Sequence, residues 1–182
     1  MKSFVLLLFL FAMLNGHSQT TKKKGCDCKY SFTNQLGLAE GQKESFLVQT
    51  IHGIKRSSWF GGIGVGIDGY RVRSIPLFLD VRKSFGKKPN GIFAYADGGV
   101  HFPWLRDEQK FNYWGDFEKG YYFDGGLGYK IALRKHELLF SGGFSMKQLR
   151  EVRTNTICPF IGPCFGQSEK YEYVMRRVTL KV

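Results

Sequence analysis

The chain has 182 residues, a formal net charge of +12, 23 glycines and 16% aromatic residues. Its length suits one domain and leaves little room for a second. After the first twenty positions no stretch of 18 uninterrupted apolar residues occurs, so no membrane-spanning helix is expected in the rest of the chain. The basic residues are scattered over expected turns and not gathered on one element, which argues against a nucleic-acid-binding protein.

The N-terminus has the pattern of a secretory signal peptide. A single charge at Lys2 precedes an apolar run from Phe4 to Leu14, and small residues follow at Gly16 and Ser18. We therefore expect residues 1–18 to be cleaved, residues 19–29 to form a short N-terminal segment, and residues 30–182 to form the folded domain.

Eight later segments have the period-two or glycine-aromatic pattern of β-strands. They cover residues 30–39, 45–54, 59–68, 73–83, 91–101, 121–132, 137–149 and 171–182. No segment keeps a helical period over three turns, so the sequence predicts an all-β fold, namely an eight-stranded antiparallel up-and-down barrel.

The two faces of these strands differ in size and polarity. In residues 62–68 the β-branched residues share one face and the glycines the other. Across the later strands the small face also carries charges of both signs. We predict that these form a polar network inside the barrel: Asp80, Arg82, Asp124, Lys130, Glu137 and Lys147.

Eight strands enclose a space only just wide enough to be filled by side chains. The small, charged face suits this interior, whereas the large apolar face suits hydrocarbon. A soluble, lipocalin-like carrier is the alternative, and it would need the apolar face inside, around a ligand. A soluble barrel with the small, charged face inside would instead expose a large apolar surface to water, which soluble monomers rarely do. The expected barrel is therefore transmembrane, with a plugged interior that forms no channel.

The expected connections alternate in length. The two long ones, Phe102–Gly120 and Arg150–Lys170, are the fifth and seventh, and odd-numbered connections share one rim of an even-stranded barrel. Outer-membrane barrels have short periplasmic turns and longer extracellular loops. The pattern predicts that the long connections face outward from the cell.

Signal peptide, eight short strands and alternate long loops resemble the small outer-membrane barrels of Gram-negative bacteria, the OmpA/OmpX-like class. Residues 62–68, 75–80 and 95–99 look like strands of that class. The resemblance implies a location in the outer membrane, insertion by the outer-membrane assembly machinery, contact with outer-membrane lipids, and a structural or surface-interaction role. Members of this class usually end in an aromatic residue, whereas this chain ends in Val182.

The four cysteines belong to an exported chain, where disulfides form. Cys158 and Cys164 enclose five residues of the last long connection, and we predict a disulfide between them. Cys26 and Cys28 precede the first strand. They could stay free, pair between chains or bind metal, although no further ligands are evident.

Small outer-membrane barrels include lipid-modifying enzymes of the lipid A deacylase and acyltransferase types, which form the main alternative. The residues to weigh are His52, His101, His136, Ser74, Ser141 and Glu137. No Ser–His–acid unit is evident in their order or placement. We expect no catalytic residues, no bound metal and no cofactor.

Aromatic residues gather in the connection from Phe102 to Gly120: Trp104, Phe111, Tyr113, Trp114 and Phe117. They are expected to form an aromatic girdle where the strands leave the membrane. The alternative is an adhesive surface that binds an unknown ligand. The short turns are basic, and we expect them to engage anionic lipid headgroups or the acidic cell wall.

Overall fold

The computed structural model describes residues 28–41, 44–69, 72–86, 88–104, 115–134, 136–157 and 165–182. Within these ranges it is built of antiparallel strands alone. Their bounds are β1 (Cys28–Glu40), β2 (Ser45–Arg56), β3 (Trp59–Asp68), β4 (Ser74–Ser84), β5 (Gly91–Pro103), β6 (Gly115–Glu118), β7 (Gly120–Leu133), β8 (His136–Ile157) and β9 (Phe165–Lys181).

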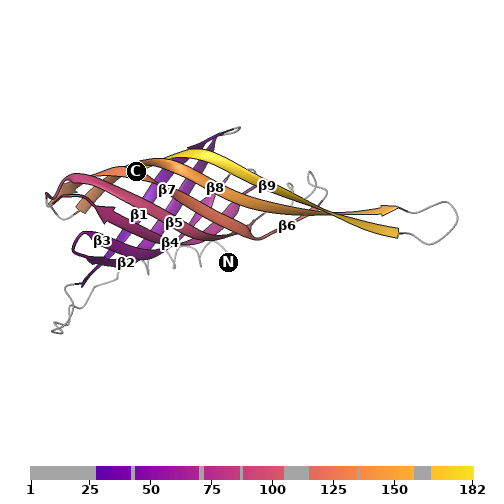
Figure 1. Cartoon of the computed structure of the whole chain (residues 1–182), viewed down its shortest axis with the longest axis horizontal. Helices are drawn as coiled ribbons and strands as arrows, with labels where there is room; N and C mark the ends of the chain where they lie inside the picture. Colours follow the sequence, from indigo (N-terminus) through magenta and orange to yellow (C-terminus); the bar gives the residue numbers. More distant parts are fainter. Residues whose placement is uncertain are drawn as a thin grey trace, which may run out of the picture.

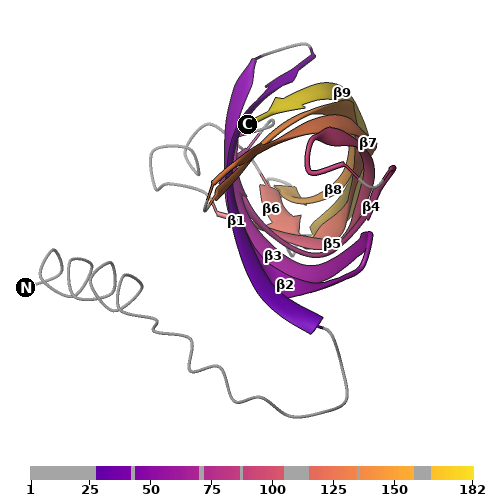
Figure 2. The same cartoon turned by 90° about the vertical axis from the view of Figure 1, so that its left-hand side faces the viewer.

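Eight of these strands form a closed ring. Each strand pairs with its neighbour in the order β1-β2-β3-β4-β5-β7-β8-β9, and β9 pairs back with β1. Seen along the ring in Figure 2, the strands surround a common interior. The eight expected segments correspond to these eight strands, and the all-β, antiparallel prediction is confirmed. The strand from Gly115 to Glu118 was not expected.

Burial follows the period-two pattern of the sequence around the ring. In β3 the branched residues Ile63, Val65 and Ile67 are exposed and alternate with buried or half-buried inward residues. β4 repeats the arrangement, with Phe78 inside and Leu79 outside. The outer surface of these strands is therefore apolar. The interior holds small and polar side chains together with a few aromatic and aliphatic ones, such as Tyr122, Ile51 and Leu149.

Glycine and aromatic residues fit together in the interior. A Cβ atom on Gly64 would lie 2.4 Å from the ring of Phe78, and one on Gly128 would lie 2.4 Å from the ring of Phe93. The absence of a side chain on one strand thus leaves the space that a ring from the neighbouring strand fills. Phe78 in turn packs against Tyr122, with 5.4 Å between ring centroids.

Gly64→Val should therefore lower the free energy of unfolding by about 1–3 kcal/mol, the usual cost of overpacking. The matched control is Gly61→Val on the same strand, since nothing lies within 4 Å of a Cβ at Gly61. Urea unfolding of both variants measures the difference. Equal stability of the two variants would show that the ring of Phe78 is not held in place.

The last long connection differs from the prediction. Residues 150–170 were expected as a loop, but most of them continue β8 and β9, which pair from Ser141 and Lys181 out to Ile157 and Phe165. The prediction was wrong because two strands of mixed polarity outside the ring show no clear alternation in the sequence. Figure 1 shows the resulting ribbon extending beyond the ring, with β6 beside it. β6 pairs with residues 150–153 of β8.

Candidate functional site

Ion pairs cross the interior near the end of the ring from which the ribbon extends. Lys147 on β8 donates to both carboxylate oxygens of Asp68 on β3 and, at 2.7 Å, to Ser74 Oγ. Ser74 donates in turn to Asp68 Oδ1 at 2.8 Å. β3 and β8 are four strands apart in a ring of eight, so this contact joins opposite walls. The side chains of Lys147 and Asp68 are 1% and 3% exposed, so this cluster is buried between the two walls.

Three aspartates lie side by side in the middle of the ring. Asp80, Asp97 and Asp124 are register partners on β4, β5 and β7, and all are buried. Lys181 from β9 contacts Asp97 at 3.0 Å and Asp124 at 3.1 Å. Arg82 pairs with Asp80 at 2.8 Å. The row thus holds three carboxylates against two cations.

Hydrogen bonds from other strands complete this middle layer. Asp124 accepts from Tyr95, Tyr122 and Thr179. Gln49 on β2 donates to Tyr122 on β7, again from one wall to the opposite one. Asp124 is therefore the most heavily bonded carboxylate of the three. By contrast, Oδ1 of Asp97 has no hydrogen-bond partner in the described part of the chain.

The opposite end of the ring, where the short turns lie, is open and basic. Lys55 donates to Glu137 at 2.7 Å, and Lys130 lies 3.7 Å from the same carboxylate. The carboxylate of Glu137 thus has two ammonium groups beside it and forms ion pairs with both. The three side chains therefore carry a net charge of about +1 near neutral pH.

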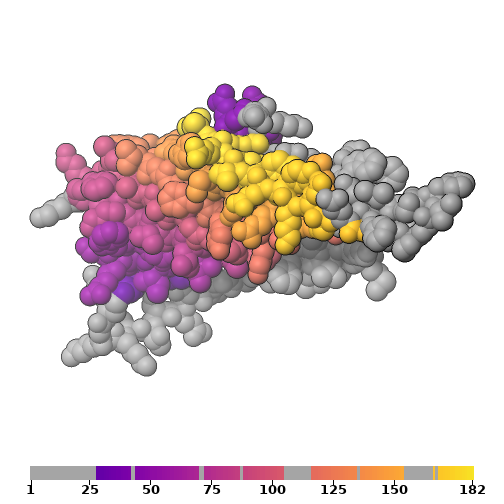
Figure 3. Space-filling view, turned by 45° about the vertical axis from the view of Figure 1, so that its right-hand side comes forward, coloured from indigo at the N-terminus to yellow at the C-terminus, as the bar shows by residue number. Residues whose placement is uncertain are grey.

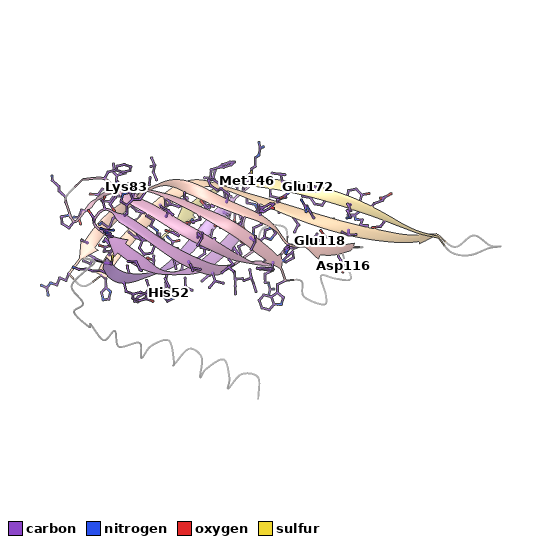
Figure 4. The ribbon with its side chains drawn as sticks, turned by 60° about the horizontal axis from the view of Figure 1, so that its bottom comes forward. His52, Lys83, Asp116, Glu118, Met146 and Glu172 are labelled. Atoms are coloured by element: carbon purple, nitrogen blue, oxygen red, sulfur yellow. The ribbon has the colours of Figure 1, made fainter. Side chains whose placement is uncertain are left out.

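Exposed tryptophans mark both ends of the ring. Trp59, at the β2–β3 turn, has the ammonium of Lys83 4.4 Å from its ring centroid. Trp104, just beyond β5 at the other end, has the guanidinium of Arg73 at 5.2 Å. Lys83 and His52 point away from the ring in Figure 4, as does Met146 farther along. Between the two ends the outer surface is apolar, with Phe46, Leu79 and Leu127 each more than 60% exposed.

The residues predicted to share one polar network fall into three groups. Asp80, Arg82 and Asp124 belong to the middle layer, Lys147 to the layer beyond it, and Lys130 and Glu137 to the basic end. Sequence reasoning missed several partners: Asp68, Asp97, Lys181 and Lys55. For Asp68 the signal was present, because it lies on the same face of residues 62–68 as the glycines. Lys55, Asp97 and Lys181 lie on or next to the second, fifth and eighth segments, which alternate too weakly to fix an inward position.

The residues weighed for catalysis do not converge on an accessible site. His52 faces outward and hydrogen-bonds Tyr30, while His136 lies at the basic end. His101 is buried and bonds the carbonyl oxygen of Gln148. Ser74 does meet Lys147, but its proton is donated to Asp68 and its oxygen accepts from the ammonium.

Several other predictions concern residues outside the described ranges. These are the signal peptide over 1–18, the disulfide between Cys158 and Cys164, and the aromatic residues Phe111, Tyr113 and Trp114. Cys28 is disulfide-bonded, and the other three cysteines lie outside the described ranges. Of the predicted rim aromatics, Trp104 is half exposed and Phe117 lies on β6.

Comparison of the chain with models of known protein families, with curated proteins and with solved structures finds no match. Among the described residues there is no helix both long and apolar enough to traverse a bilayer. The same residues contain no group of three or more histidine, cysteine, aspartate or glutamate side chains that could hold a metal ion.

Proposed function

We propose that the chain is an integral outer-membrane protein: a transmembrane, eight-stranded β-barrel with a plugged interior and a structural or surface-interaction role. The observation that carries this proposal is the polarity of the ring. Apolar side chains cover its outer surface, whereas ion pairs fill its interior. A soluble monomer rarely exposes an apolar surface of this extent, and a lipocalin-like carrier would need the opposite arrangement.

Strand length and the two ends support the same proposal. A membrane-crossing strand needs about 9–11 tilted residues, and β3 and β4 have 10 and 11. The tryptophan–cation pairs of Trp59 and Trp104 lie at the two ends of the apolar surface, where aromatic residues gather at membrane interfaces. Export by a signal peptide and insertion by the outer-membrane assembly machinery belong to this proposal.

The interior favours a structural protein over a channel or an enzyme. Contacts between opposite walls, such as Lys147 with Asp68 and Gln49 with Tyr122, support a plugged interior. The ribbon of β8 and β9 projects from one end of the ring (Figure 1). In this proposal it faces the outside of the cell and presents the surface for contact. Asp116 and Glu118 of β6 lie beside it (Figure 4).

Leu79→Arg tests the proposal because lipid and water treat an exposed arginine differently. In a bilayer the substitution near the middle of the apolar surface should cost about 2–4 kcal/mol. In water an exposed position tolerates it within about 0.5 kcal/mol. The control is Ile54→Arg, an exposed aliphatic position of β2 two residues before the end of the strand at the basic end.

The measurements are urea unfolding in lipid vesicles and retention of the wild type in the membrane fraction after an alkaline wash. Release of the wild type by the wash, or equal stability of the two arginine variants, would contradict membrane insertion.

A further inference from the structure

Polar side chains interrupt the apolar outer surface of the ring on β1 and β2. On β3 the outward residues after Trp59 are glycine or branched: Gly61, Ile63, Val65 and Ile67. The outward positions of β5 and β7 are likewise apolar, aromatic or glycine. Figure 3 shows β9, in yellow, on the molecular surface next to β8, in orange, and both expose mainly aromatic and aliphatic side chains in the ring. The same alternation instead turns Asn34 on β1, and Thr50 and His52 on β2, outward.

Register and hydrogen bonds hold these side chains together. Asn34 and Thr50 are register partners, as are Phe32 and His52. The imidazole of His52 lies 6.2 Å from the ring of Phe32, at an angle of 20°. Its Nδ1 lies 2.6 Å from the hydroxyl of Tyr30, and its Nε2 lies 3.2 Å from that of Thr50. Three neighbours thus fix this imidazole, which points away from the barrel in Figure 4. We call Tyr30, Asn34, Thr50 and His52 the polar patch.

The polar patch has more donors than acceptors that they reach. With one proton on the imidazole, Tyr30, His52 and Thr50 carry three polar hydrogens but share only two contacts with one another. If Nδ1 accepts from Tyr30, then Nε2–H donates to Thr50 and the threonine hydrogen is left over. In the other tautomer the tyrosine hydrogen is left over. The amide of Asn34 makes no side-chain hydrogen bond to another residue in the described ranges. One hydroxyl and one amide therefore face outward with donors to spare.

The polar patch extends to the middle of the apolar surface. Thr50 lies six residues along β2 from Arg56, the register partner of Trp59. A rise of about 3.3 Å per residue and a tilt of about 40° place Thr50 about 15 Å from the level of Trp59. The apolar band of an outer-membrane barrel is about 25 Å tall. A position in the aromatic belt at the rim therefore accounts for Tyr30, but not for Thr50 or Asn34.

We propose that the polar patch is the centre of an interface between two copies of this chain in the membrane. The inference rests on the proposed membrane insertion, because only hydrocarbon leaves these groups without water. Acyl chains offer neither donors nor acceptors at this depth, so the groups gain hydrogen bonds only from another polypeptide. In the dimer, Asn34 and Thr50 of each copy bond their counterparts in the other copy.

A second copy is the partner that the geometry favours. A primary amide has donors and an acceptor, so two asparagines complement each other. A two-fold axis along the membrane normal brings each residue to the depth of its own counterpart. Apolar side chains surround the polar patch, among them Val48 on the same strand, and Ile63 and Val65, the register partners of His52 and Thr50. They supply the dry contact in which a hydrogen bond is strongest.

The test measures dimerisation of the refolded full chain by sedimentation equilibrium in density-matched neutral detergent. The wild type should dimerise as the ratio of protein to detergent rises. Asn34→Leu with Thr50→Val replaces the polar groups by apolar ones of similar size. This double variant should weaken the dimer roughly tenfold or more, the value of two hydrogen bonds between polypeptides in a membrane. Heat-dependent gel migration verifies that each variant is folded.

The matched control is Tyr121→Phe with Tyr129→Phe, which removes two outward hydroxyls from β7, on the wall opposite β2. It should leave dimerisation unchanged. Three results would overturn the interface: a wild type that is monomeric at every ratio, an equal loss in the control, or an undiminished dimer of Asn34→Leu with Thr50→Val.

Photocrosslinking in lipid vesicles locates the interface on the outer surface. Benzoylphenylalanine introduced at Val48 should crosslink a second copy, whereas the same group at Leu127 on β7 should not. Crosslinks from Leu127 alone would contradict the proposed face. An alkaline wash of membranes tests insertion separately. A chain that resists the wash but stays monomeric refutes the interface and leaves the proposed function intact, whereas a released chain refutes membrane insertion itself.

Discussion

Lys147→Met should lower the free energy of unfolding by about 3–5 kcal/mol, the usual cost of leaving one member of a buried ion pair without its partner. The carboxylate of Asp68 would remain almost fully buried, with Ser74 as its remaining donor among the contacts described above. Because Lys147 joins opposite walls of the ring, its loss should also loosen the contact between β3 and β8. Urea unfolding in lipid vesicles, followed by tryptophan fluorescence, measures the change.

Two further variants separate the ion pair from the mere loss of a charge. Arg150→Met removes an exposed cation from the same strand and should change stability by no more than about 0.5 kcal/mol. Lys147→Met combined with Asp68→Leu removes both charges and should restore most of the loss. If the double variant were as unstable as Lys147→Met alone, the cost would come from packing and not from the unpaired carboxylate.

Lys181→Met should have an effect of similar size, about 3–5 kcal/mol, because it leaves two buried carboxylates without their cation. The row of three aspartates leads to a second prediction, which concerns the removal of one carboxylate charge. Like charges directly opposite each other on neighbouring strands repel, and three carboxylates face two cations. Removal of one charge from this row should therefore be tolerated, provided that few hydrogen bonds are lost with it.

Asp97→Asn and Asp124→Asn form the matched pair for this expectation. Asp97 accepts one hydrogen bond from Lys181 and has one oxygen without a partner among the described residues, whereas Asp124 accepts from Tyr95, Tyr122 and Thr179 and also forms an ion pair with Lys181. We expect Asp97→Asn to leave stability within about 1 kcal/mol of the wild type and Asp124→Asn to cost about 1.5–3 kcal/mol more. The reverse order in urea unfolding would show that Asp97, and not Asp124, anchors Lys181.

The two ends of the ring are separated by these ion-paired layers. The middle layer and the Lys147 cluster lie between the basic end, with Lys55, Lys130 and Glu137, and the ribbon of β8 and β9. In the proposed orientation, the basic end lies at the headgroups of the inner leaflet and the ribbon faces the outside of the cell.

The sequence alone predicted the eight strands of the ring and which side chains face outward on the strands that alternate clearly. In β3 and β4, residues such as Ile63 and Leu79 repeat every second position, and this period directly reflects the geometry of a strand. Small or charged residues on the opposite face indicated a filled interior. These features are local, so a single strand's sequence contains them.

Partners across the interior depend on the tertiary structure. Asp68 and Lys147 are 79 positions apart, and they meet only because the ring closes with β3 opposite β8. The row of three aspartates likewise depends on the register of three strands. The β8–β9 ribbon and β6 were not visible in the sequence either, since they depend on where hydrogen bonding between strands begins and ends. A period of two fixes the face on which a side chain lies, whereas closure and register decide which side chain lies across from it.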